Sequence, residues 1–121
     1  MQIVKGWLNK DGTSAERIYD VAVSDERKIG PDGRCKTPVG DTVNVKEASY
    51  TNTIGDPLLF AYWSDPDFDS ALNAFYYVRV IEISTPRWPA YDAKKFGIKM
   101  PNEVVMKHQE RGDTSPIYYT P

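Results

Sequence analysis

The stretch "AFYYVRVIEISTP", residues 74–86, decides the fold of this 121-residue chain. Large apolar residues occupy both of its alternating faces, with Phe75 and Tyr77 on one side and Tyr76 on the other. This pattern predicts a strand that is covered on both faces. The strand is predicted at residues 75–83, and Pro86 and Pro89 prevent its continuation as a paired central strand, because proline cannot donate to a sheet ladder.

Further strands are expected on both sides of this stretch. Gln2–Asn9 and residues 15–23 alternate apolar and polar residues and are separated by Asp11-Gly12. This dipeptide is a strong hairpin signal, because glycine adopts the positive φ that a tight turn needs. "LLFAYWS" is apolar at nearly every position, which is typical of a central strand. Additional strands are predicted at residues 42–46, 49–53, 58–64 ("LLFAYWS") and 114–120.

Helical signals are few. Residues 90–97 resemble a short helix closed by Gly97, and residues 65–73 a turn that passes into a single helical turn. Periodicity does not decide between strand and helical turn at residues 103–112. The sum predicts a mainly β fold, a β-sandwich-like or open-barrel arrangement of six to eight short antiparallel strands with one or two short helices. At this length, residues 1–121 form a single domain.

Composition excludes several function classes. The net charge of −2 lacks the basic excess of a nucleic-acid-binding protein. No apolar run is long enough to cross a membrane or to serve as a signal peptide, so the sequence leaves the compartment open. The single cysteine, Cys35, excludes an intrachain disulfide. With only one histidine, His108, the chain cannot assemble a multi-histidine metal site, and we expect no cofactor in this domain.

One acidic segment resembles a calcium loop. In "SDPDFDS", Asp65, Asp67 and Asp69 occupy alternate positions, but Ser70 and Tyr76 stand where a helix-loop-helix calcium site requires glycine and glutamate. The three aspartates therefore remain a weak calcium candidate, and turn formation is the favoured interpretation.

The segment "RWPAYD" offers the one candidate ligand site. Trp88 and Tyr91 could stack against a sugar ring, with Arg87 beside them. The alternative, which we favour, is that Trp88 covers the open end of the sheet, because tryptophan is mostly buried in folded domains. No catalytic serine motif, phosphate-binding glycine motif or nucleophile–base pair is present, so catalytic residues are predicted to be absent.

Several motifs together resemble one family. "MQIVKGW", "YTNTIGDP", "WSDPDFD", "AFYYVRVIEISTPRW", "YDAKKFG" and "ERGDTSPIYYTP" are similar, in this order, to the C-terminal end of the bacterial domain of unknown function 3604 family. The resemblance implies a longer parent protein whose N-terminal part looks like a metal-dependent hydrolase of the polymerase and histidinol phosphatase superfamily. It also implies export, since family members are often exported. The first predicted strand starts directly after Met1, which leads us to expect a C-terminal piece of such a protein.

These observations predict a non-catalytic structural or accessory domain. Its expected partner is the N-terminal domain of the same parent chain. One alternative is a carbohydrate-binding module that uses Trp88 and Tyr91. Another is an independent enzyme that relies on carboxylates alone, such as Asp65, Asp67 and Glu82.

Overall fold

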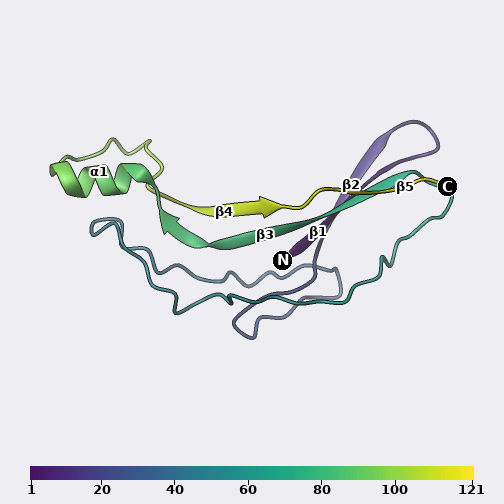
Figure 1. Cartoon of the computed structure of the whole chain (residues 1–121), viewed down its shortest axis with the longest axis horizontal. Helices are drawn as coiled ribbons and strands as arrows, with labels where there is room; N and C mark the ends of the chain where they lie inside the picture. The colour runs from purple at the N-terminus through teal and green to yellow at the C-terminus, as the bar shows by residue number, and fades with distance from the viewer.

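The computed structural model describes all residues, 1–121, and contains one antiparallel sheet of five strands and one helix (Figure 1). The strand order is β2-β1-β3-β4, and β5 also pairs with β3. The mainly β antiparallel class predicted above is confirmed. The elements are β1 (Gln2–Leu8), β2 (Ser14–Asp20), β3 (Ala74–Pro86), α1 (Trp88–Phe96), β4 (Lys107–Asp113) and β5 (Ile117–Tyr119).

The predicted N-terminal hairpin is present. β1 and β2 pair along their whole length, from Gln2 opposite Asp20 to Leu8 opposite Ser14. Gly12 in the connecting turn has a φ of 84°, a conformation that L side chains rarely adopt. The hairpin is joined to the rest of the sheet by β1, which pairs with β3 over residues 74–79.

β3 is the central strand, as its sequence predicts. β1 lies along one edge, and β5 and β4 share the other edge, at residues 74–76 and 79–86 respectively. The register with β4 shifts between Ile81 and Ser84, so β3 carries an irregularity there. The strand runs past its predicted end at Ile83 and stops at Pro86. The segment that periodicity left undecided forms β4 over its second half.

Helix α1 follows β3 immediately. Pro89 stands in its first turn, where a missing N–H costs nothing. Gly97 closes it in the left-handed conformation with a φ of 63°, as the sequence predicts. Lys94 and Lys95 in the last turn interact favourably with the negative end of the helix dipole. No helix is both long and apolar enough to pass through a membrane.

Three details of the predicted fold are wrong. There are five strands in one open sheet, and no second sheet completes a sandwich or barrel. Residues 42–46 and 49–53 contribute only an isolated bridge between Asn44 and Ser49. Residues 58–64, predicted as a central strand, pair with no strand of this chain. Apolar composition showed that this segment is suited to a sheet, but pairing also requires a neighbouring strand, and this chain supplies none.

The connection between β2 and β3, residues 21–73, forms a second layer of irregular structure. It runs along one side of the sheet over most of its length (Figure 1). Few residues are buried as a result: 11 of 121, among them Val4 and Tyr19 in the sheet and Ala90 in α1. The core is therefore small for a chain of this length.

Candidate functional site

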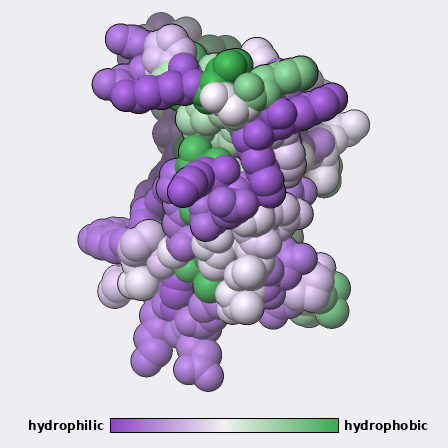
Figure 2. Space-filling view, turned by 90° about the vertical axis from the view of Figure 1, so that its left-hand side faces the viewer, coloured by the Kyte–Doolittle hydropathy of each residue, from purple (hydrophilic) through white to green (hydrophobic).

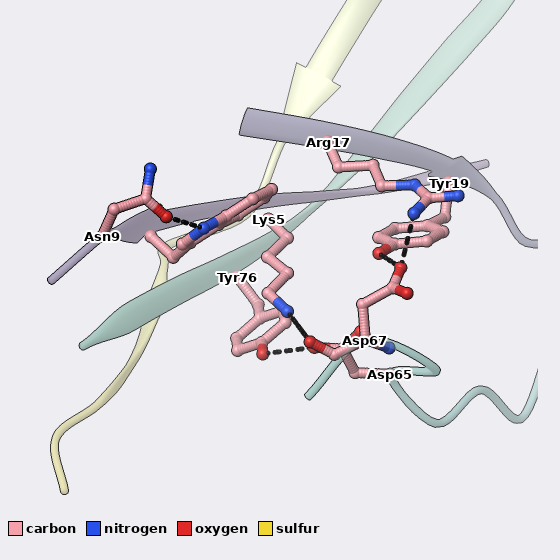
Figure 3. A network of polar contacts seen from close by, with 8 residues as sticks. Lys5, Asn9, Arg17, Tyr19, Asp65, Asp67 and Tyr76 are labelled. Atoms are coloured by element: carbon pink, nitrogen blue, oxygen red, sulfur yellow. Dashed lines mark hydrogen bonds and ion pairs between the residues drawn. The ribbon is translucent and has the colours of Figure 1, made fainter. Parts of the chain in front are cut away.

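A network of charged and phenolic side chains joins the sheet to the loop that follows residue 64 (Figure 3). We call it the latch, and it consists of Lys5 on β1, Arg17 and Tyr19 on β2, Tyr76 on β3, and Asp65 and Asp67 in the loop. Lys5 is directly opposite Arg17 on one side and Tyr76 on the other, so these three side chains leave the same face of the sheet.

Lys5 is the centre of the latch. Its Nζ lies 2.6 Å from Asp65 Oδ2 and donates a second hydrogen bond, of 2.8 Å, to the Asp67 carbonyl oxygen. The side chains of Lys5 and Asp65 are only 6% and 7% exposed. A buried ion pair of this kind holds the loop in one position, because removing either partner leaves an uncompensated charge away from water.

The two tyrosines donate to the same aspartates. Tyr76 Oη donates to Asp65 at 2.7 Å, and Tyr19 Oη donates to Asp67 at 2.7 Å. Burial and the hydrogen bonds to these carboxylates raise the pKa of Tyr19 and Tyr76 far above the ordinary value of a phenol. Both hydroxyl groups therefore stay protonated at any physiological pH and act as hydrogen-bond donors.

The pKa of Asp65 shifts in the opposite direction. Burial by itself would raise the pKa of Asp65, but hydrogen bonds from Lys5 and Tyr76 outweigh burial and hold that pKa below its ordinary value. Asp67 forms a more exposed ion pair with Arg17, at 2.6 Å. Each charge of the latch thus has a partner of opposite sign.

A shallow depression of about 380 Å³ lies beside the latch. Trp7 forms part of its wall, and the Lys5 ammonium lies 5.2 Å from the centre of the Trp7 ring, within cation–π range. The Trp7 indole N–H donates to Asn9 at 2.9 Å. The residues lining the depression are Lys5, Trp7, Arg17, Asp67, Asp69, Leu72, Ala74 and Tyr76. Because Lys5, Arg17 and Asp67 are already held in ion pairs, the arrangement fixes a loop more readily than it activates a substrate.

The aspartates of the weak calcium candidate accept hydrogen bonds within the chain. Asp65 and Asp67 accept from side chains of the sheet, and Asp65 and Asp69 accept from the Asp67 N–H at 2.9 Å and the Ala71 N–H at 2.8 Å in turns. No group of three or more acidic, histidine or cysteine side chains lies close enough together to hold a metal ion. The turn-forming interpretation describes Asp65 and Asp69, whereas sequence reasoning did not foresee that Asp65 and Asp67 also bind the sheet.

The structure places the candidate ligand residues at the start of α1. Trp88 is 66% exposed and Tyr91 49% exposed, so the favoured prediction that Trp88 covers the end of the sheet is wrong for this chain. Arg87 is the residue that precedes the helix, and its Nη1 donates to the Val105 carbonyl oxygen at 3.4 Å. Its Nε is buried and has no hydrogen-bond partner.

The remaining sequence candidates, Glu82, His108 and Cys35, form no contact with the latch. Glu82 is six positions from Tyr76 along β3, a separation of about 20 Å in an extended strand. It therefore does not join Asp65 and Asp67 in a carboxylate group. His108 bonds with Glu110 on β4, and the Cys35 thiol contacts the Thr37 carbonyl oxygen.

Sequence reasoning missed Lys5, Arg17, Tyr19 and Tyr76 as members of one network. A signal was present at Lys5, which stands in the middle of the otherwise apolar run "QIVKGWL". A lysine in a strand that is covered by other segments requires a carboxylate partner, because burying a lone ammonium group is costly. The identity of that partner, 60 residues away, depends on the tertiary structure.

Comparison with known proteins places the chain in one family. A family model described as "Protein of unknown function (DUF3604)" matches residues 1–121, the whole chain. The family resemblance inferred from the sequence motifs is thereby confirmed. No curated protein and no solved structure shows a significant match to the chain.

Proposed function

Since the chain belongs to the DUF3604 family of proteins of unknown function, we propose from its surface that it is a non-catalytic structural domain. Its role is to dock against another folded part of a larger protein. The observation that carries this proposal is the amount of surface that the folded chain leaves exposed.

The accessible surface is larger than a self-sufficient domain of this size needs. The chain exposes 8604 Å². A folded monomer of 13.7 kDa is expected to expose about 6,600 Å². The excess, about 2,000 Å², is as large as the surface that one partner contributes to an obligate interface, roughly 1,000–2,500 Å². Docking against a second folded body would therefore bring this chain to the burial of an ordinary domain.

Part of the exposed surface is apolar. Figure 2 views the molecule from its α1 end and shows hydrophobic residues at the surface between hydrophilic ones. Exposed apolar side chains on this scale mark interaction surfaces in folded proteins. The most exposed large apolar residues are Leu58, Phe60, Tyr62, Trp88, Phe96, Ile117 and Tyr118, at 63% to 91%.

Under this proposal the partner is an N-terminal domain of the same polypeptide. Chemistry of the metal-dependent hydrolase type, which the family resemblance implies, then belongs to that domain. The paired charges of the latch are consistent with this division of roles, because Lys5 and Arg17, the two cations that line the depression beside Trp7, are each bound to an aspartate. The present chain then supports that N-terminal domain and contributes to its shape.

Two linked measurements test the proposal. An antibody raised against this chain should detect a native gene product several times larger than 13.7 kDa in the source cells. In that purified protein, cleavage at a protease site introduced directly before Met1 should leave the present chain bound to the remainder during gel filtration. A native band at the size of this chain, or separation of the two parts after cleavage, would refute the proposal.

A second candidate, carbohydrate binding, is favoured by one observation. Trp88 and Tyr91 are three positions apart on α1, so they share a face of the helix, and both are exposed. An exposed aromatic pair of this kind can stack against sugar rings. If it does, mono- and oligosaccharides should change the tryptophan fluorescence of the chain, and Trp88→Ala should abolish that change. Trp63→Phe serves as the control for signals from a tryptophan outside α1. Equal responses of the wild type and Trp88→Ala would contradict this function.

A further inference from the structure

Residues 58–64 have the form of a strand although they pair with none. The segment contains no turn, bend or helix, and alternate residues face in opposite directions. Leu58, Phe60 and Tyr62 are 77%, 88% and 91% exposed, whereas Leu59, Ala61 and Trp63 are partly covered. A period of two in burial is the pattern of a β-strand with one covered face.

The backbone of this segment is free. The N–H groups of residues 59–64 and the carbonyl groups of residues 58–64 make no hydrogen bond within the chain. Only the Leu58 N–H is satisfied, by the Asp56 carboxylate at 2.9 Å. Both lateral edges of the segment therefore present unpaired donors and acceptors, as the edge of a sheet does.

The segment is held in this form at both ends. At its C-terminal end, Asp65 is bound to Lys5 in the latch. At its N-terminal end, the Gly55 N–H donates to Asp25, and Gly55 approaches Ile83 so closely that a Cβ would lie 2.7 Å from its methyl group. The segment therefore crosses the sheet in the direction opposite to β3. Between these ends, Trp63 packs against Tyr19, with 5.0 Å between ring centres.

We infer that residues 58–64, which we call the docking strand, belong to a second sheet whose remaining strands come from the partner body. This inference rests on the proposed function and names the mode of docking. The partner adds an edge strand beside the docking strand through main-chain hydrogen bonds and covers Leu58, Phe60 and Tyr62 with its own apolar side chains. The sandwich that the sequence predicts is thus completed between two bodies.

The charges around the docking strand favour such a partner over a second copy of this chain. The strand itself carries no charge, while Asp56 precedes it and Asp65 and Asp67 follow it. Asp65 and Asp67 are already paired with Lys5 and Arg17 within the chain, so Asp56 carries the unpaired charge beside the strand. In an antiparallel pair of two copies centred on residue 60 or 61, Asp56 would lie opposite residue 64 or 66 of the other copy, where the sequence offers no lysine or arginine. A partner edge with lysine or arginine at that position would instead attract Asp56.

The outward face of the docking strand accounts for a substantial part of the excess accessible surface. A phenylalanine and a tyrosine each bury about 150–250 Å² when covered. Together with Leu58, the outward face therefore accounts for roughly a quarter of the excess of about 2,000 Å². The partner also covers other apolar residues, and the docking strand fixes the register of the complex.

Hydrogen exchange tests the pairing directly. In the isolated chain, the amides of residues 59–64 should exchange within about tenfold of the rates for unstructured peptide, because they have no hydrogen-bond acceptor. In the full-length gene product, every second amide of residues 58–64 should be protected by at least about 100-fold, because one edge of a strand presents alternate N–H groups.

A matched pair of variants tests the outward face. Phe60→Asp places a charge in the proposed contact, and Val105→Asp places the same charge at an apolar residue outside the surface named above that is 55% exposed. After cleavage before Met1 in the full-length protein, Phe60→Asp should weaken retention of the chain by about 100-fold, and Val105→Asp by less than about threefold.

The outcomes separate this inference from the proposed function. If the cleaved wild-type chain stays bound but residues 59–64 exchange at the rate of the isolated chain, or if the two variants are equally impaired, the docking strand is refuted and the proposed function stands. If the wild-type chain is released, the proposed function fails and the inference fails with it. A dimer of the isolated chain with protected amides at residues 59–64 overturns the assignment of a different partner.

Discussion

Replacing Lys5 by methionine tests the buried ion pair of the latch. Methionine has nearly the volume of lysine but no charge, so the Lys5→Met variant leaves the Asp65 carboxylate, which is 7% exposed, without a cation. Breaking a buried pair by removing one partner costs about 3–5 kcal/mol. Asp65 keeps the hydrogen bonds from Tyr76 and from the Asp67 N–H, which places the expected loss near the lower limit, at about 3 kcal/mol. For a chain of this length, that loss lowers Tm by roughly 10–15 °C.

The pH dependence of this effect has a definite sign. The folded-state pKa of Asp65 is lower than its ordinary value of 3.8, so its stabilising contribution is complete above about pH 4. The contribution is lost as the pH falls through the folded-state pKa. In Lys5→Met, the unpaired Asp65 is expected to have a raised pKa, so its proton should relieve the defect at low pH. The difference in unfolding free energy between wild type and variant should therefore shrink between pH 7 and pH 3.

Urea and thermal unfolding followed by circular dichroism, at pH 7 and at pH 3, measure these differences. The matched control is the double variant Lys5→Met with Asp65→Asn, which removes both charges. It should recover most of the stability, because replacing a whole buried pair by neutral groups is often close to neutral. If Lys5→Met lowers the free energy of unfolding by less than about 1 kcal/mol, and by the same amount at both pH values, the buried ion pair does not stabilise the fold.

Two further substitutions examine the sheet. Tyr76→Phe removes the hydroxyl group that donates to Asp65. Because a hydrogen bond to a buried charge is lost, the free energy of unfolding in urea should fall by about 1–2 kcal/mol. A variant as stable as the wild type would contradict the role given to that bond. Gly6→Ala puts a Cβ 2.4 Å from the ring of Phe75, which covers the glycine from the neighbouring strand. It should cost about 1 kcal/mol, since the partly exposed ring can move aside. The control Gly112→Ala, with no atom within 4 Å of the new Cβ, should change stability by less than about 0.5 kcal/mol in the same assay. Equal effects of the two alanines would refute the covering role of the ring.

The sequence predicted those strands and helix ends whose determinants lie close to them in the chain. The hairpin of β1 and β2 follows from alternation around Gly12, and the end of α1 follows from Gly97. β3 follows from large apolar residues on both of its alternating faces, interrupted by Arg79, and from the prolines that follow. In each case the determinant lies within a few residues of the element, because turn conformations and the period of the side chains are properties of the local backbone.

The candidate site could be predicted only in part. The sequence drew attention to Asp65 and Asp67, but it could not show that they bind Lys5 and Arg17. Pairs that are 50 to 60 positions apart form when the connection of residues 21–73 crosses the sheet, and no local pattern encodes the path of that connection. The exposure of Trp88 likewise depends on which segments reach the start of α1.

The amino-acid sequence by itself determined a mainly β chain with a strand that covers residues 75–83, a helix closed by Gly97, and membership of its family. Tertiary structure alone decided that the apolar segment of residues 58–64 lies over the sheet without a strand beside it. The physical reason is that hydrophobicity and alternation specify what a strand can cover, whereas pairing depends on whether another backbone lies beside it.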